Sequence, residues 1–557
     1  MSFTTSPLMT PILRIHPADN AIVALRDLDA GFTAGLDGTT WTLREKIPAK
    51  QKFAAKDFAI GDIVTMYGVV VGKTTQAVPA GALLHTHNLK HASATFAGKQ
   101  SAYAWTPPDV SKWKTRTFNG FKRPQGPAGT ANHWVVIPLV FCENRNLGFM
   151  REALVRELGY GKTSPYERFA RTLADLHRRG ASREDIEAAM LEAEAAEKAS
   201  RLFPNVDGVK FLEHGLGCGG TRQDAQALCR LLAGYIYSPN VCGATVLSLG
   251  CQHAQVSLLE QEMAALYPKL EKPLLVYEQQ KSQSERDMMQ RAIRDTFLGI
   301  ASANEQTREA CPLSDLIMAV ECGGSDGFSG ISANPAIGHT ADLLAALGGA
   351  PVLSEFPELC GVEQSLCDRC VTAELADKFV RLMRAYEGAA QACGSGFDAN
   401  PSPGNIRDGL ITDAIKSAGA AKKGGNAPIV DVTDYAEPIR QGGGLTLCCT
   451  PGNDVESTTA LAGAGCTMIL FTTGLGTPTG NPVCPTLKLS TNTTLAKRMP
   501  DIIDYDCGPI ITGEKTVEQC GEEVFDLVIA TASGEYMPKA VALGQDDFLP
   551  WKRGVSL

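Results

Sequence analysis

The stretch Trp134-Val-Val-Ile-Pro-Leu-Val140 decides the fold class of this 557-residue chain. A nearly continuous apolar run of this length is typical of a strand that is buried on both faces. Two further runs of this kind, at residues 206–212 and 244–249, flank a helical pattern at residues 223–235. Strands that alternate with helices predict a parallel sheet, so the sequence indicates an α/β protein.

A second α/β stretch extends from about residue 312 to the last residue. We expect strands there at residues 316–320, 445–448, 468–471 and 525–530. Glycine-rich loops, such as residues 323–330, lie beyond the ends of these strands. Because loops at strand ends are where an α/β sheet builds its binding site, we expect the functional site in such loops.

The first part of the chain has a different pattern. Short apolar stretches between residues 12 and 92 are broken by turn pairs such as Asp37-Gly38, which predicts a small β domain. The next segment contains proline-rich turns without sustained periodicity, so we interpret it as a linker. The predicted organisation is a β domain at residues 12–92, a linker at 93–130, a middle α/β domain at 131–305 and a C-terminal α/β domain at 306–557.

A helical insertion is predicted inside the middle domain, at residues 164–202. Apolar side chains between Tyr166 and Leu176 recur on one helical face, and Ser182 and Asp185 have the spacing of a capping box. We interpret the insertion as a lid or an oligomer contact.

Composition limits the class of protein and its partners. The chain has 52 Lys and Arg against 61 Asp and Glu, and a net charge of −9, which disfavours nucleic acid and anionic membranes as partners. No apolar run approaches the roughly 18–20 residues that a membrane span needs, and no secretory signal is visible at the N-terminus. Seventeen cysteines then indicate reduced thiols, some of them metal ligands, in a cytoplasmic protein.

Two nucleotide-binding motifs are incomplete. Residues 68–74 (GVVVGKT) resemble a phosphate-binding P-loop, but their glycines are one residue too close and no helix is expected to follow. Residues 215–220 (GLGCGG) fit G-x-G-x-x-G between a strand and a helix, although Pro239-Asn240 stands where an acidic residue would hold a ribose hydroxyl. A dinucleotide site there stays open as a minor alternative.

Three cysteines directly follow predicted parallel strands: Cys218, Cys251 and Cys322. If the three strand ends share one edge, the thiols could converge on one metal ion or cluster. Cysteine is also a common small core residue, so both interpretations stay open. His85 and His87, two residues apart in an extended segment, point to the same side and suit a general base or metal contacts.

Several motifs occur together in one order: LHTHN at 84–88, FNGFKRP at 118–124, CGGSDGFSG at 322–330, NPSPGN at 400–405, PGND at 451–454, FTTGLGTP at 471–478 and PTLKLSTN at 485–492. With these motifs the chain resembles the altronate/galactarate dehydratase family over essentially its whole length. The resemblance implies an N-terminal SAF-type β-clip domain, a middle α/β domain and a C-terminal Rossmann-like parallel sheet.

The resemblance also implies an iron-dependent dimer that dehydrates a 2,3-dihydroxy acid to a 2-keto-3-deoxy acid. The cofactor would be Fe²⁺ or an iron–sulfur cluster held by three cysteines, with another divalent cation as an alternative. Such an elimination needs a base at C2, an acid for the departing C3 hydroxyl, and donors or a metal to stabilise the enediolate.

Candidate residues follow from these requirements. The iron ligands would be Cys218, Cys251 and Cys322, and the catalytic groups His85, His87 and Asp326. The side chains expected to bind the substrate are Asn88, Asn132, Ser325, Ser329, Asn405, Arg407, Asn453, Asp454, Thr477 and Lys488.

Three positions depart from the family pattern, which has cations where this chain has Ala131, Ile406 and Leu475. Loss of cations that suit a carboxylate is not conservative. We therefore expect a substrate other than altronate. Three alternatives follow: elimination of sulfite from a sulfolactate-like acid, a nicotinamide oxidoreductase that uses residues 215–220, and a non-catalytic acid-binding paralogue.

Overall fold

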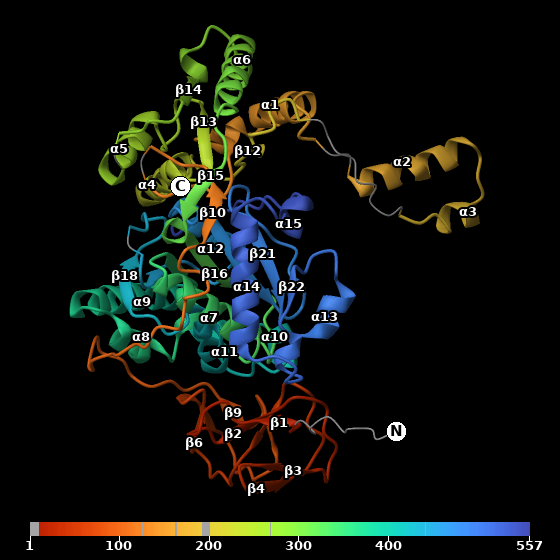
Figure 1. Ribbon diagram of the computed structural model, residues 1–557, viewed down its shortest axis with the longest axis vertical. Helices are drawn as coiled ribbons and strands as arrows, with labels where there is room; N and C mark the ends of the chain where they lie inside the picture. Colours follow the sequence, from red (N-terminus) through yellow and green to blue (C-terminus); the bar gives the residue numbers. More distant parts are fainter. Residues whose placement is uncertain (1–9, 125, 162–163, 192–200, 268, 441) are drawn as a thin grey trace.

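The computed structural model describes residues 10–124, 126–161, 164–191, 201–267, 269–440 and 442–557. It consists of an N-terminal β region, a large C-terminal domain above it and a middle domain at the opposite end of the molecule (Figure 1). Among the described residues, the structure has no helix with the length and apolar character needed to cross a membrane.

The N-terminal β region is built from short antiparallel strands, as predicted. One sheet contains, in spatial order, β1 (Ile12–Leu13), β2 (Ala21–Ala24), β5 (Lys52–Ala54) and β8 (Leu83–Leu84). A second sheet contains β6 (Ile63–Met66), β7 (Val69–Thr74) and β9 (Leu89–Lys90). A third sheet pairs β3 (Thr33–Leu36) with β4 (Thr39–Thr42).

The middle domain contains a four-stranded parallel sheet, which confirms the three predicted strands. Its order is β12 (Gly208–Phe211), β11 (His133–Pro138), β13 (Val241–Ser248) and β14 (Leu274–Glu278). Its main helices are α1 (Asn144–Glu157), α4 (Arg222–Tyr237), α5 (Val256–Leu266) and α6 (Glu285–Ala303).

The helical insertion stands away from the rest of the molecule (Figure 1). It contains α2 (Pro165–Arg178) and α3 (Arg183–Glu187), and none of their described side chains is buried. The predicted capping box is present, because the Ser182 hydroxyl accepts from Asp185 N–H and the Asp185 carboxylate accepts from Ser182 N–H. Residues 192–200 of the insertion lie outside the described residues.

The C-terminal domain contains a seven-stranded parallel sheet. Its order is β18 (Ile429–Thr433), β19 (Leu445–Cys448), β17 (Ala350–Leu353), β16 (Ile317–Cys322), β20 (Met468–Thr473), β21 (Thr486–Ser490) and β22 (Tyr505–Asp506). Its helices are α7 (Ala333–Ala346), α8 (Glu363–Arg369), α9 (Ala373–Ala392), α10 (Pro403–Arg407), α11 (Asp413–Ala420), α12 (Asp454–Gly463), α13 (Thr493–Arg498), α14 (Val517–Ala532) and α15 (Lys539–Ala542).

The strand prediction at residues 525–530 is wrong, because these residues lie within α14. Buried positions in α14, among them Gly521, Phe525 and Val528, recur at helical spacing, and a capping box of Thr516 and Gln519 begins the helix. A short apolar run cannot by itself distinguish a buried strand from one face of a helix.

The predicted linker is fastened to the C-terminal domain. Within it, β10 (Thr117–Gly120) pairs antiparallel with β15 (Glu309–Pro312). The buried Trp113 packs edge-on against Phe525, and its indole N–H donates to Asp526 Oδ1 at 2.8 Å. The segment between the N-terminal β region and the middle domain is therefore ordered by tertiary contacts that its sequence does not show.

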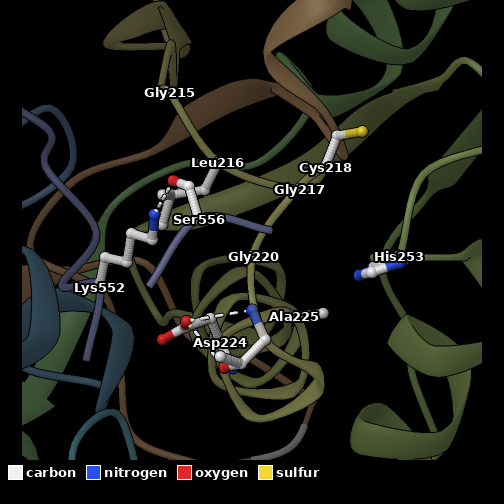
Figure 2. A pocket seen from close by; sticks show the side chains of 11 residues that line it. Gly215, Leu216, Gly217, Cys218, Gly220, Asp224, Ala225, His253, Lys552 and Ser556 are labelled. Carbon is white, nitrogen blue, oxygen red and sulfur yellow. Dashed lines mark hydrogen bonds between the residues drawn. The ribbon is translucent and has the colours of Figure 1, made fainter. Parts of the chain in front are cut away.

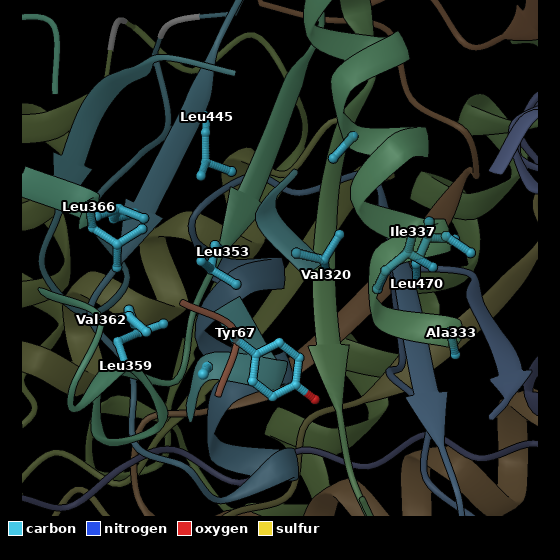
Figure 3. Close-up of a cluster of buried hydrophobic side chains, with 14 of the residues drawn as sticks. Tyr67, Val320, Ala333, Ile337, Leu353, Leu359, Val362, Leu366, Leu445 and Leu470 are labelled. Carbon is cyan, nitrogen blue, oxygen red and sulfur yellow. The ribbon is translucent and has the colours of Figure 1, made fainter. Parts of the chain in front are cut away.

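One apolar core joins the N-terminal β region to the C-terminal domain. Tyr67, in the turn between β6 and β7, belongs to the same cluster as Val320 and Leu353 (Figure 3). Its left-handed backbone (φ 58°) is held by the buried Asp19 carboxylate, which accepts from Tyr67 N–H and Gly68 N–H. The β6–β7 turn thus presents Tyr67 to the C-terminal ends of β16 and β17.

Candidate active site

The loop after β16, residues 323–330, is the centre of the candidate site; it is called the glycine loop below. Its fully buried Asp326 pairs with Lys50 at 3.0 Å and accepts from Ser329 Oγ at 3.1 Å and Asn492 Nδ2 at 3.3 Å. Asp326 was predicted to be catalytic. In the structure its oxygens connect the glycine loop to the N-terminal β region.

Side chains of the N-terminal β region dock on the glycine loop and on the segment around Asp408. Lys50 pairs with both Asp326 and Asp408, and the Lys52 ammonium donates to Gly409 C=O. A Cβ at Gly330 would overlap the Tyr67 hydroxyl, so only glycine permits this approach. Burial lowers the pKa of Lys52 to about 7, whereas the two carboxylates beside Lys50 outweigh its burial and raise its pKa.

A buried acid–base cluster lies at the end of β16: Cys322, Glu355, Glu358, Lys416 and Lys423. Lys423 Nζ is 2.9 Å from Cys322 Sγ and also pairs with Glu355. Lys423 is only 1% exposed, and its burial alone would disfavour the ammonium. The negative groups around it, chiefly Cys322 and Glu355, outweigh burial and raise the pKa of Lys423 well above its ordinary value.

Glu355 occupies a strained backbone position with φ 61°. A non-glycine residue in this region costs about 1–3 kcal/mol, and such residues concentrate at functional sites. Among the described residues, neither its Oε1 nor Oε1 of the neighbouring Glu321 has a hydrogen-bond partner, although both atoms are buried. Burial and the charge of Glu355 raise the pKa of Glu321 well above its usual range, which favours the protonated carboxyl.

The second pair of the acid–base cluster faces a cavity. Lys416 Nζ lies 2.6 Å from Glu358 Oε1 and donates to Asn400 Oδ1 at 3.0 Å. Lys416, Ser325 and Ser329 line the same small cavity, together with Cys322 and Asn334. An ammonium, a thiol and hydroxyls therefore surround a space beside the glycine loop.

Asp454, at the start of α12, lies directly against the glycine loop, because a Cβ at Gly323 would overlap its carboxylate. Burial and the charges of Glu355 and Glu358 raise the pKa of Asp454 to about 7. A large fraction of this carboxyl therefore holds a proton at neutral pH, as a general acid requires.

His85 and His87 lie near each other on the N-terminal β region, with stacked rings whose centroids are 6.1 Å apart. His85 is half-buried and His87 is exposed. Burial, followed by the influence of His87 and Lys52, lowers the pKa of His85, so its imidazole is neutral at pH 7. The Asn88 side chain accepts from His85 N–H and donates to Leu83 C=O, and these bonds shape the loop.

The other predicted substrate residues separate into two sets. Asn405 donates to Ser325 C=O at 2.8 Å and Thr477 packs on Gly324, so both adjoin the glycine loop. The remaining four are exposed or bond to residues outside the glycine loop. Arg407 is exposed and Asn453 caps α12. Asn132 forms hydrogen bonds with Asn205 and Arg123, and Lys488 with Gln545.

The three predicted iron ligands do not share one sheet edge. Cys218 and Cys251 are exposed after β12 and β13 of the four-stranded sheet, whereas Cys322 is buried in the seven-stranded sheet. In the part of the chain that the structure describes, Cys322 instead converges with Glu355 and Glu358, with ligand atoms within 4.8 Å of one another. A cysteine sulfur and two carboxylates, one with an Oε1 that has no partner among the described residues, fit a divalent transition metal by donor type.

The turn at residues 215–220 contacts another segment of the chain (Figure 2). Lys552 and Ser556 line the pocket beside this turn, and Leu557 N–H donates to Gly219 C=O at 2.5 Å. Asp224, in the first turn of α4, accepts from Arg553 N–H and Gly554 N–H. In a Rossmann-type site the pyrophosphate binds beside this turn and needs free space and positive potential there. Here the Asp224 carboxylate and residues 552–557 lie at that position.

Sequence reasoning missed Glu355, Glu358, Lys416, Lys423 and Lys50. Glu355 follows the buried strand β17 by two residues, a strand-end position that the same argument used for Cys322 could have identified. Neither lysine of the acid–base cluster carries a local signal, since both lie in an alanine-rich segment whose burial depends on distant contacts.

Comparison with known proteins identifies the family of the chain. Residues 10–92, 120–304 and 313–556 match, in turn, the altronate/galactarate dehydratase SAF domain, the D-galactarate dehydratase/altronate hydrolase second domain and the D-galactarate/altronate dehydratase C-terminal domain. The chain is 32% identical to the altronate dehydratases of Bacillus subtilis (95% of this chain, 96% of the relative) and Escherichia coli (94% and 95%). It is 28% identical to the galactarate dehydratase (L-threo-forming) of Escherichia coli (94% and 93%). The chain is therefore a hydro-lyase that belongs to the altronate/galactarate dehydratase family.

Proposed function

We propose that this hydro-lyase removes water from a 2,3-dihydroxy sugar acid of the altronate type and forms a 2-keto-3-deoxy acid. The observation that carries the proposal is the acid–base cluster, which contains the Lys416–Glu358 and Lys423–Glu355 pairs and presents Lys416 and Cys322 to a small cavity. Such buried charges stabilise a developing enediolate far better than water does, because they are already oriented before the reaction.

The proposed reaction combines a group of the N-terminal β region with groups of the C-terminal domain. Neutral His85 takes the proton from C2, and the charge that develops on the substrate carboxylate faces Lys416, with Lys423 behind it. Asp454 donates its proton to the C3 hydroxyl, which leaves as water when the C3–O bond breaks. The resulting enol takes a proton at C3 and releases the proton of its C2 hydroxyl, which gives the 2-keto acid.

We also propose that Fe²⁺ is the cofactor, held by Cys322, Glu355 and Glu358. When bound, iron would polarise substrate oxygens as a Lewis acid. The two carboxylates and the thiol would hold the ion, and the ion pair of Glu358 with Lys416 keeps the ammonium at the cavity.

Iron content tests the ligands. We expect anaerobically prepared protein to contain iron, and Cys322→Ser to weaken iron binding by about tenfold or more, because a hydroxyl is a poorer ligand than a thiolate. Cys218→Ser and Cys251→Ser are the matched controls and should retain iron. Iron lost from both controls but retained in Cys322→Ser would contradict the assignment.

Product release from a panel of acids tests the reaction. We expect anaerobic enzyme with Fe²⁺ to release a 2-keto-3-deoxy acid from at least one 2,3-dihydroxy acid. Altronate, galactarate, shorter aldonic acids and sulfolactate belong in the panel. Release of sulfite alone, or no turnover of any acid, would refute dehydration.

The missing cations give a prediction about substrate preference. Leu475 N–H donates to Gly324 C=O and Ile406 adjoins Asn405, so both border the glycine loop. Ala131 is buried, and its N–H donates to Asn240, which in turn donates to Thr467 C=O at the start of β20. Leu475 follows the other end of β20, and the two ends are roughly 17 Å apart along the strand. We expect altronate and galactarate to be poor substrates of the wild type.

Ile406→Lys with Leu475→Arg should then raise kcat/KM for altronate by about 10–100-fold per cation. Each bond to a charged group contributes about 1.5–3 kcal/mol, and about 1.4 kcal/mol is a tenfold change. Ala131→Arg serves as the control and should give no gain. An equal gain from Ala131→Arg would show that the structural distinction is wrong.

A further inference from the structure

A second group of metal-ligand side chains lies outside the candidate active site. His91, Cys360 and Asp413 each offer one ligand atom, and these atoms all lie within 4.8 Å of one another. His91 directly follows β9 of the N-terminal β region, whereas Cys360 and Asp413 belong to the C-terminal domain. The group therefore lies across the junction of the two.

Packing holds the three segments together without an ion. Thr412, which caps α11, donates its hydroxyl to Val71 C=O in β7 at 2.8 Å. Gly361 has φ 93°, and a Cβ there would lie 3.2 Å from Ala414 Cβ and 3.5 Å from Ser93 Cβ. The segments that carry the three ligands are thus in direct contact at Gly361.

Two of the three ligands have polar atoms that the protein leaves unsatisfied. Asp413 is only 2% exposed; its Oδ1 accepts from Ser417 Oγ, while Oδ2 is buried without a hydrogen-bond partner among the described residues. His91 Nδ1 is also buried, and no described residue forms a hydrogen bond with it. Native proteins rarely leave such atoms unpaired unless an ion or water binds them. The buried Glu363 accepts from Gly361 N–H at 2.6 Å and adds a further carboxyl group near the three ligands.

We propose that His91, Cys360 and Asp413 bind a divalent transition-metal ion, Zn²⁺ in the first place, which fastens the N-terminal β region to the C-terminal domain. An imidazole, a thiolate and a carboxylate are the three ligand types of Zn²⁺ sites, and four-coordinate geometry leaves one position for water. His91 and Cys360 are half-buried, so an ion can reach the site from solvent.

The bound ion has a consequence for the candidate active site. Cys360 is two residues beyond Glu358, and Asp413 is three residues before Lys416 on α11. An ion held by Cys360 and Asp413 fixes the same two segments that carry the Glu358–Lys416 pair. We therefore assign the site a positioning role.

Co²⁺ is the probe that tests the site, because a thiolate ligand gives it an intense charge-transfer absorption. Metal-free full-length protein titrated with Co²⁺ should show this band. The Cys322→Ser variant should retain the component of the absorption that comes from Co²⁺ bound to Cys360. Cys360→Ser should lose that component, and His91→Gln should weaken Zn²⁺ binding by at least about tenfold in competition with a chromophoric chelator. No substrate is involved, so the result is independent of the proposed dehydration.

A stability measurement keeps the proposal falsifiable if a variant is poorly folded. Zn²⁺ should raise the Tm of the wild type and of Cys322→Ser, but not that of Cys360→Ser. A Co²⁺ spectrum that is unchanged in Cys360→Ser would overturn the proposal. So would wild-type protein with no Co²⁺–thiolate absorption beyond the amount that Cys322→Ser removes.

Discussion

Replacement of Lys423 by methionine is expected to lower the free energy of unfolding by about 3–5 kcal/mol and kcat by about 10²–10³-fold. The stability loss follows because Glu355 would stay buried with its charge uncompensated. The loss of kcat follows because one oriented charge that stabilises the enediolate disappears. Chemical denaturation and steady-state kinetics, both well below the Tm of the variant, measure the two effects separately.

Two further variants separate the contributions of Lys423. Lys422→Met changes the neighbouring lysine, whose side chain is exposed, and should leave both quantities near wild type. Adding Glu355→Gln to Lys423→Met removes both charges and should recover much of the stability without the activity. Recovery of activity in the double variant would mean that Lys423 serves the fold alone.

Replacement of Asp454 by asparagine is expected to reduce kcat by about 10²–10⁴-fold with little change in stability. The amide keeps the shape of the carboxyl but cannot deliver a proton to the departing hydroxyl. Because the pKa of Asp454 is raised to about 7, the wild type should lose activity as the pH rises through about 7, where the carboxyl loses its proton. The variant should lack this alkaline limb.

Glu456→Gln is the matched control, since Glu456 lies in the same first turn of α12 and is half-buried. It should keep both the rate and the alkaline limb. At acid pH the rate should fall only below the lowered pKa of His85, because the base must be neutral. A wild-type profile that stays flat above pH 7, or a fully active Asp454→Asn, would remove Asp454 from the reaction.

The apolar pattern of the sequence was sufficient to predict most of the buried parallel strands. The run at residues 445–448 is a strand with the same bounds, and the runs around Trp134 and Met468 are central strands. A strand that is buried on both faces can be predicted from its own sequence, because nearly all its side chains are apolar. Residues 525–530 show the limit, because a short apolar run in α14 has the same composition as a buried strand.

The sequence by itself determined the family, the parallel sheets, the N-terminal β region and the position of the glycine loop with Ser325, Asp326 and Ser329. Each of these rests on a local pattern. Only the tertiary structure decided which charges meet: Lys423 is 101 positions from Cys322 and 68 from Glu355. It also separated Cys218 and Cys251 from Cys322 by assigning them to different sheets. Buried charges are stabilised by partners far away in sequence, and no local periodicity encodes such pairing.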